Sequence, residues 1–216
     1  RVGALFIYLE NVKQFSSIQS QVKQVIRKNY STPPAYGAAL VKEILSNEVT
    51  ECWKVIAQLH HTPSVLILSR QNLPTLDRST FESASGTAKG AYILAEAKNG
   101  TPDLLLMASG SEVQLCTQVY QKLTLEGHNV RVISMPCWEL FEKQSKEYRE
   151  SIIPTHCTNR IAVEQASSFG WERYVPNTDC IVAMRTFGAS APLKDLQTKF
   201  GFTPDAIINK AKELLS

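Results

Sequence analysis

The stretch that decides the fold class is Asp103-Leu-Leu-Leu-Met-Ala-Ser-Gly-Ser-Glu-Val113. Its first part, residues 103–108, is a short apolar run typical of a buried strand. The chain then turns through a glycine and enters residues 112–125, which we predict to be helical because apolar residues recur there on one face. That face holds Val113, Cys116, Val119, Tyr120 and Leu123. Gly127 is placed to end this helix.

The same alternation continues on both sides of this stretch. We expect further short strands at residues 91–95, 129–134, 160–163 and 180–184. Thr203-Pro204-Asp205 opens a final helix, because proline is favoured in a first helical turn. Its apolar stripe is Ile207, Ile208, Ala211, Leu214 and Leu215. Strands that alternate with helices predict an α/β fold, with a mostly parallel sheet and helices on both faces.

The N-terminal part divides into three segments. Residues 1–46 stay unassigned, since an apolar start and a polar amphipathic stretch lead only to the helix-breaking Ser31-Thr32-Pro33-Pro34. Residues 47–88 hold a helix capped by Asn47, a predicted buried strand at 64–68, and a polar linker that runs from residue 72 to 90. Residues 89–216 form the main α/β domain, and the segment before it is a truncated α/β unit.

Composition excludes several classes of function. Hydrophobic residues make up 44% of the 216, which is enough for a substantial core. The 23 basic and 20 acidic residues are scattered, so we expect no nucleic-acid partner. The longest apolar runs are far short of the roughly 20 residues that cross a bilayer, so we expect no membrane partner. We see neither a secretory nor a transit signal and expect a cytoplasmic protein.

Metal binding and nucleophilic catalysis have little support. The cysteines form no C-x-x-C pair and lie among apolar neighbours, so we interpret them as buried free thiols: Cys52, Cys116, Cys137, Cys157 and Cys180. His60 and His61 lack carboxylates or cysteines at ligand spacing, so we predict no metal site. No serine lies in a G-x-S-x-G elbow, and His128 and His156 lie in polar loops, so we predict no catalytic residue in this chain.

Two segments are candidates for anion binding. Ser109, Gly110 and Ser111 join a strand to a helix, where backbone N–H groups can face an anion or a regulator. The alternative is a tight turn with Ser111 as a helix cap and Gly110 relieving backbone strain. Arg70 directly follows the predicted strand at 64–68, where open α/β sheets bind ligands, and its guanidinium can grip a phosphate. An ion pair at the domain boundary is the alternative for Arg70.

A carboxylate and a group of aromatic residues have structural interpretations. Glu164 ends the 160–163 strand and has no evident histidine or lysine partner, so we interpret it as a satisfied structural carboxylate. The aromatic group is Phe169, Trp171, Tyr174 and Phe187. We expect it to form core or a subunit contact rather than a cofactor site.

Several motifs, in this order, resemble transketolase. They are Thr62-Pro-Ser-Val-Leu-Ile-Leu-Ser-Arg-Gln-Asn-Leu-Pro74, Gly110-Ser-Glu-Val113, Arg131-Val-Ile-Ser-Met-Pro136 and Phe187-Gly-Ala-Ser-Ala-Pro192. The stretches Trp138-Glu-Leu-Phe-Glu142 and Ser167-Ser-Phe-Gly-Trp-Glu-Arg-Tyr174 resemble the C-terminal domain of that family in register. The resemblance covers residues 47 to 216, and it identifies 47–88 as the end of the pyrimidine-binding domain plus a linker.

The resemblance implies an activity, cofactors and partners. Transketolases transfer a two-carbon ketol unit from a ketose phosphate to an aldose phosphate in the pentose phosphate pathway. They use thiamine diphosphate with magnesium or calcium, held between two subunits, and the cofactor performs the carbanion chemistry. The arginine of the family's S-R-Q-N-L-P segment binds the sugar phosphate, so the resemblance assigns that role to Arg70.

The departures from the family pattern set further expectations. We cannot locate the residues that bind the cofactor and metal, and the missing domains would need about 300 further residues. We therefore expect the isolated chain to be inactive without a homodimer or a partner chain that carries those domains. A fragment, a split gene product and a diverged frame stay open. The functional alternatives are a non-catalytic interaction or regulatory module and a sister enzyme such as dihydroxyacetone synthase.

Overall fold

The computed structural model describes residues 48–59, 62–68 and 73–216. The predictions for residues 1–46, the Asn47 cap, His60, His61 and Arg70 lie outside these residues. The described residues belong to one compact unit.

The centre of this unit is a five-stranded sheet with the strand order β1-β3-β2-β4-β5. The strands are β1 (Tyr92–Ala95), β2 (Leu104–Ala108), β3 (Val130–Ser134), β4 (Arg160–Ser167) and β5 (Ile181–Met184). Only β1, at one edge, runs antiparallel to its neighbour, and the other three pairings are parallel. The predicted mostly parallel sheet is therefore confirmed, with strand positions close to those expected and β4 longer than predicted.

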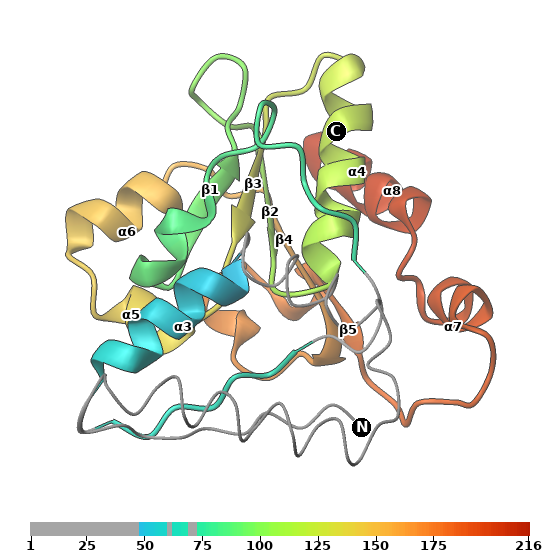
Figure 1. Ribbon diagram of the computed structural model, residues 1–216. Helices are drawn as coiled ribbons and strands as arrows, with labels where there is room; N and C mark the ends of the chain where they lie inside the picture. Colours follow the sequence, from blue (N-terminus) through green and yellow to red (C-terminus); the bar gives the residue numbers. More distant parts are fainter. Residues whose placement is uncertain (1–47, 60–61, 69–72) are drawn as a thin grey trace. The chain divides into compact units, whose positions relative to one another are not determined.

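Helices cover both faces of the sheet (Figure 1). One face packs against α4 (Glu112–Leu125) and α8 (Pro204–Leu215), and the other packs against α5 (Trp138–Glu142) and α6 (Lys146–Ile152). Helix α7 (Leu193–Phe200) lies between β5 and α8 along the chain. The strand residues alternate between the two apolar layers, because successive side chains of a strand point to opposite faces. Leu104 and Leu106 lie in the α4 layer, whereas Leu105 lies in the α5 layer.

Single residues explain where α4 ends and where α8 begins. Gly127 follows α4 in the left-handed region, at φ 98°, which relieves the strain that a side chain would meet there. Thr203 precedes α8, and its Oγ1 accepts a hydrogen bond from the Ala206 N–H at 3.3 Å. Both predicted helix ends are confirmed. Ser111 occupies the N-cap position of α4, as the alternative interpretation of this turn expected, but its side chain makes no capping hydrogen bond to the α4 backbone.

The expected strand at residues 64–68 is wrong. Helix α3 (Glu48–Gln58) is present as predicted, but the segment that follows forms no strand among the described residues. The side chains of Val65 and Ile67 are 86% and 88% exposed. An apolar run becomes a buried strand only when neighbouring strands supply hydrogen bonds and a covered face. The described sheet supplies neither to this segment, because its five strands all come from residues 92–184.

The polar stretch expected to be a linker is packed in its second half. Phe81, Ala84 and Thr87 are buried, and residues 84–89 form the short helix η2 (Ala84–Lys89). Gly90 then adopts φ 87° and lets the backbone approach the start of α5. The composition of this segment does not predict its packing, because burial of one large apolar side chain, Phe81, is enough to hold a short polar segment against the core.

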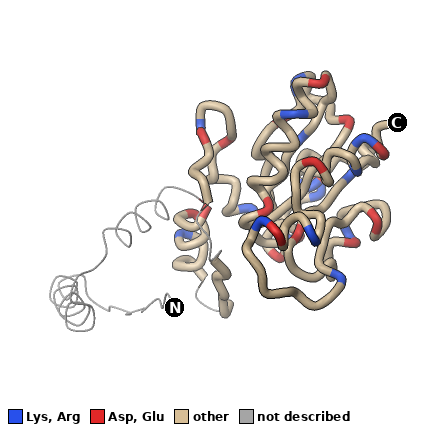
Figure 2. The backbone as a smooth tube through the Cα atoms, turned by 90° about the vertical axis from the view of Figure 1, so that its right-hand side faces the viewer, with Lys and Arg blue, Asp and Glu red and all other residues tan. Residues whose placement is uncertain are grey.

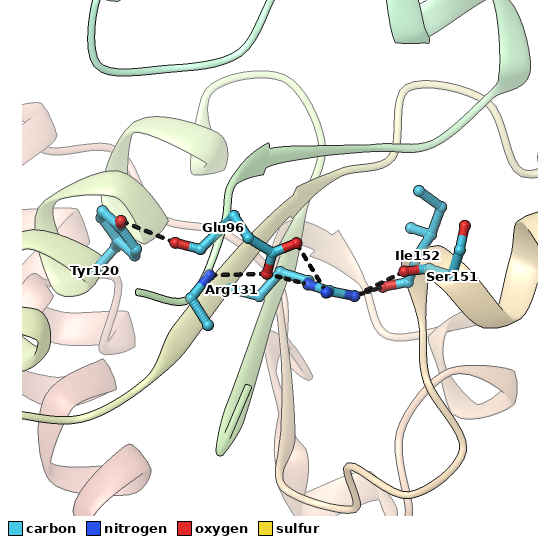
Figure 3. A network of polar contacts seen from close by, with 6 residues as sticks. Glu96, Tyr120, Arg131, Ser151 and Ile152 are labelled. Atoms are coloured by element: carbon cyan, nitrogen blue, oxygen red, sulfur yellow. Dashed lines mark hydrogen bonds and ion pairs between the residues drawn. The ribbon is translucent and has the colours of Figure 1, made fainter. Parts of the chain in front are cut away.

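An ion pair between a buried arginine and an exposed carboxylate joins β3 to the end of β1 (Figure 3). Arg131 Nε and Nη2 donate to the two carboxylate oxygens of Glu96 at 2.8 and 2.9 Å. Its Nη1 donates to the carbonyls of Ser151 and Ile152 at 2.8 and 3.0 Å. The Arg131 side chain is 7% exposed, so these four bonds replace the water that the charge loses on burial.

Figure 2 shows acidic and basic residues interspersed along the described backbone, in line with the scattered charge of the sequence. Within the described part of the chain, no helix is both long and apolar enough to cross a bilayer.

Candidate functional site

The carboxyl ends of β2 and β4 form the candidate site. These strands are paired neighbours, with Ala108 opposite Val163, so the residues that follow them lie side by side. The chain leaves β2 toward α4, which covers one face, whereas the α5 and α6 connection to β4 covers the other. Ligands of open α/β sheets bind where successive connections leave in opposite directions.

The predicted turn is present at this edge. Gly110 adopts φ 55°, a conformation that would strain a residue with a side chain, so the expectation that Gly110 relieves backbone strain is confirmed. The two serine hydroxyls both face carboxylates. Ser109 Oγ donates to Glu164 Oε2 at 3.2 Å, and Ser111 Oγ donates to Glu112 Oε1 at 2.5 Å.

The two carboxylates near this turn favour the binding of a proton over the binding of an anion. Burial raises the pKa of Glu112, and the nearby Glu164 carboxylate raises it further. Burial also raises the pKa of Glu164, partly offset by the Ser109 hydroxyl. An anion at the start of α4 would meet both carboxylates. The anion site at Ser109, Gly110 and Ser111 stays a prediction, and this arrangement opposes it.

Glu164 lies on β4 beside the aromatic layer. The indole of Trp171 is fully buried and lowers the Glu164 pKa, although its N–H makes no hydrogen bond of ordinary geometry with any described residue. The prediction of a structural carboxylate agrees with this set of neighbours, since hydroxyl and backbone donors hold the group.

The predicted aromatic cluster splits into two parts. Trp171 and Tyr174 are buried, and they pack with Trp138 at ring-centroid distances of 5.0 and 6.0 Å. Phe169 and Phe187 are 82% and 99% exposed, so these two are not part of the core, and the subunit contact that was the other half of the expectation stays a prediction. Each lies in a loop after a strand, where an apolar side chain has no layer above it.

Sequence reasoning missed Glu112 as a site residue. Charged residues are rarely buried, yet Glu112 is only 4% exposed. The available signal was its position between a buried strand and the first apolar residue of the α4 face. A carboxylate there faces the free N–H groups of the first helical turn, which offset part of the cost of burying its charge.

We find no candidate site for metal binding or thiol chemistry in residues 48–59, 62–68 and 73–216. No group of three or more histidine, cysteine or acidic side chains in this part of the chain could hold a metal ion. Cys116, Cys157 and Cys180 are buried free thiols as predicted, whereas Cys52 and Cys137 are only half-buried. Burial raises the pKa of Cys52 to about 11, which leaves it protonated and a poor nucleophile at neutral pH.

Comparison with known proteins assigns the family. Residues 90–203 match the family model of the transketolase-like TK C-terminal domain. The chain is 45% identical to a transketolase of Halalkalibacterium halodurans over 179 residues, which are 83% of this chain and 27% of that protein. It is 40% identical to a transketolase of Bacillus subtilis over 178 residues, 82% of this chain and 27% of that protein. The chain thus spans about a quarter of the length of these relatives.

Solved structures agree with the fold. A transketolase from Leishmania mexicana superposes with a TM-score of 0.70 at 38% identity, over 78% of this chain and 24% of that one. A transketolase from Pichia stipitis, in complex with sedoheptulose 7-phosphate, gives a TM-score of 0.69 at 32% identity, with the same coverage. The sheet order, the helical layers and these matches together show that the chain belongs to the transketolase family, as a part that contains its C-terminal domain.

Proposed function

We propose that this chain is the C-terminal part of a working transketolase, which transfers a two-carbon ketol unit from a ketose phosphate to an aldose phosphate. The observation that carries the proposal is the match of residues 90–203 to the family's C-terminal domain, together with 45% identity to a curated transketolase. In this proposal residues 47–88 end the pyrimidine-binding domain and continue into the linker, and residues 89–216 form the C-terminal domain.

The cofactor is held elsewhere in the enzyme. The described residues contain no group of three or more histidine, cysteine or acidic side chains that could hold the divalent cation, and this supports a cofactor site formed by other parts of the enzyme. When it is bound, thiamine diphosphate supplies the carbanion chemistry of the family. The contribution of this chain is to position the substrate and to support the assembly of the subunits.

Arg70 is the residue proposed to bind the sugar phosphate. An alignment that spans 179 of the 216 residues necessarily includes Arg70, so this arginine lies within the part that is similar to a transketolase. A guanidinium stays charged at every relevant pH and can donate two parallel hydrogen bonds to a phosphate. Binding the remote phosphate would fix the sugar so that its reacting carbon meets the cofactor.

A homodimer or a partner chain with the remaining domains is proposed as the assembly. Val65, Ile67 and Leu68 are 86%, 88% and 49% exposed, which is unusual for three large apolar residues so close in sequence. Contiguous exposed apolar residues mark surfaces that another protein part covers. Covering this segment would stabilise the assembly by removing apolar area from water.

The role of Arg70 can be tested in a hybrid enzyme. Residues 48–216 would replace the matching C-terminal part of the Halalkalibacterium halodurans transketolase, to which this chain is 45% identical. In the hybrid we expect Arg70→Gln to lower kcat/KM for a ketose phosphate by about 10- to 100-fold, because a charged hydrogen bond contributes roughly 1.5–3 kcal/mol. The kcat/KM for an unphosphorylated ketose should stay unchanged.

A matched control removes one positive charge at another place. Lys98 is an exposed residue of the turn after β1, so Lys98→Gln should leave both values of kcat/KM unchanged. An equal loss for phosphorylated and unphosphorylated ketoses in Arg70→Gln would show that Arg70 has a structural role and does not bind phosphate.

A further inference from the structure

An open groove with several charged side chains lies where α5, α6, the start of β4 and the η3 turn (Trp171–Arg173) come together. Its volume is about 490 Å³, within the range of small-molecule sites. Phe141, Ile153 and Tyr174 supply the apolar part of its wall. The charged lining residues are Glu142, Lys146, Arg149, Glu150, Arg160 and Arg173.

The groove carries an excess of positive charge. Four of its six charged residues are basic and two are acidic, which leaves a formal charge of +2. Both carboxylates already have partners. Glu142 accepts from Arg149 Nη1 at 2.8 Å and from the Tyr174 hydroxyl at 2.7 Å. Glu150 lies 3.8 Å from Lys146 Nζ.

Arg160 has no carboxylate partner among the described residues. Its Nε, Nη2 and Nη1 donate to the backbone carbonyls of Cys157, Pro154 and Tyr174 at 2.7, 2.9 and 3.4 Å. These carbonyls hold the guanidinium in place without neutralising its charge. Burial lowers the pKa of Arg160, which means that its charged form lacks part of the solvation it has in water. A fixed, incompletely compensated guanidinium is suited to bind an oxyanion.

Two more arginines have unused donors. Arg173 is exposed and lies over the rings of Trp138 and Tyr174, at 5.8 and 5.9 Å from their centroids. No carboxylate within the described residues forms an ion pair with it. Arg149 Nε is buried and has no hydrogen-bond acceptor among these residues, so Glu142 only partly satisfies this side chain.

We propose that this groove binds a phosphate dianion, carried by a small phosphorylated metabolite. Arg160 and Arg173 supply guanidinium groups whose planar donors match phosphate oxygens, and Lys146 adds an exposed positive charge. Phe141 and Tyr174 are only 2% and 5% exposed, so they form the back of the groove and the charged side chains carry the binding. The charge of −2 on the phosphate matches the excess of +2 in the groove.

The test is a calorimetric and NMR titration of the 216-residue chain with inorganic phosphate and with glycerol 3-phosphate at constant ionic strength. We expect saturable binding with a Kd of about 0.1–10 mM, a range that corresponds to a small exposed anion site. Arg173→Gln should raise the Kd by about fivefold, and Glu150→Gln should lower it by about twofold, since each changes one exposed charge. Tighter binding of glycerol 3-phosphate would support an organic phosphate as the ligand, and equal binding would overturn that assignment in favour of free phosphate.

The matched control is Lys194→Gln, which removes an exposed positive charge from α7, outside the groove. Its Kd should equal that of the unaltered chain. The proposal would be overturned if no saturation occurred up to about 50 mM of either probe. It would also be overturned if Lys194→Gln weakened binding as much as Arg173→Gln, because the effect would then be general charge attraction. Arg173→Gln must keep the circular dichroism spectrum and the urea midpoint of the unaltered chain.

Discussion

Gly90 is required both by its backbone conformation and by close packing around it. It adopts φ 87°, and a Cβ atom at this position would lie 2.3 Å from both the Cys137 carbonyl oxygen and the Phe141 nitrogen. We expect Gly90→Ala to lower the free energy of unfolding by about 2–4 kcal/mol, since backbone strain adds to a clash with backbone atoms. Urea unfolding followed by circular dichroism measures this loss.

Gly100 provides the matched control. It adopts φ 69°, but a Cβ atom there would meet no atom within 4 Å. Gly100→Ala should therefore cost only about 1–2 kcal/mol, which is the strain of the left-handed conformation alone. Equal losses for the two variants would contradict the close approach of Gly90 to α5.

Glu112 should make stability depend on pH. Burial raises its folded-state pKa, so the folded protein holds a proton that the unfolded chain has released. Its contribution is full below the unfolded pKa of about 4.3 and is lost as pH rises through the folded pKa. Glu112→Gln keeps an acceptor for Ser111 but cannot ionise. We expect this variant to gain roughly 0.5–2 kcal/mol of stability near pH 7 and no advantage near pH 4.

Glu213→Gln is the control for Glu112→Gln, because Glu213 is an exposed carboxylate on α8. Its stability should follow that of the unaltered chain at both pH values. A stability gain in Glu112→Gln that did not change with pH would show that its carboxylate is not destabilised by burial.

Sequence patterns predict backbone roles of single residues better than side-chain partners. Gly110, Gly127 and Thr203 could be assigned, because a turn or a helix end selects these residue types locally. The pairing of Ser109 with Glu164 joins residues that are 55 positions apart and depends on the register of β2 with β4. Spacing along the chain carries no information about such a contact.

At the scale of elements, most of the stability that α4 contributes should come from the side chains on its buried face. Leu123 is fully buried, whereas Leu125, two positions further along, is 86% exposed. We expect Leu123→Ala to cost about 2–5 kcal/mol through lost burial and a cavity, and Leu125→Ala to cost less than about 0.5 kcal/mol. Thermal or urea unfolding of the pair gives the comparison. Similar costs would mean that α4 faces the sheet differently.

A helix or strand could be predicted from the sequence where it buries one of its faces within the described unit. The alternation of short apolar runs with amphipathic helices located all five strands, α4 and α8. The same reasoning failed at residues 64–68, because Val65 and Ile67 have the composition of a buried strand without described neighbours that would pair with it. Local sequence predicts the tendency to form a strand, whereas pairing depends on which other strands are present.

At the scale of the whole molecule, the chain contains the C-terminal domain of a transketolase, and its proposed activity depends on other domains. The family match covers residues 90–203, and the chain spans 27% of the Halalkalibacterium halodurans relative. Its exposed apolar segment at residues 65–68 supports an assembly in which another part of the enzyme covers it.

The most direct test of this account is the ketol-transfer rate of the hybrid in which residues 48–216 replace the matching part of that relative. The assay would use a ketose phosphate donor and an aldose phosphate acceptor with thiamine diphosphate and magnesium. We predict a kcat within about tenfold of the parent enzyme, since a difference of 1.4 kcal/mol is the most that a correctly placed domain should cost. A folded hybrid of the parent's oligomeric state that showed no turnover would contradict the account.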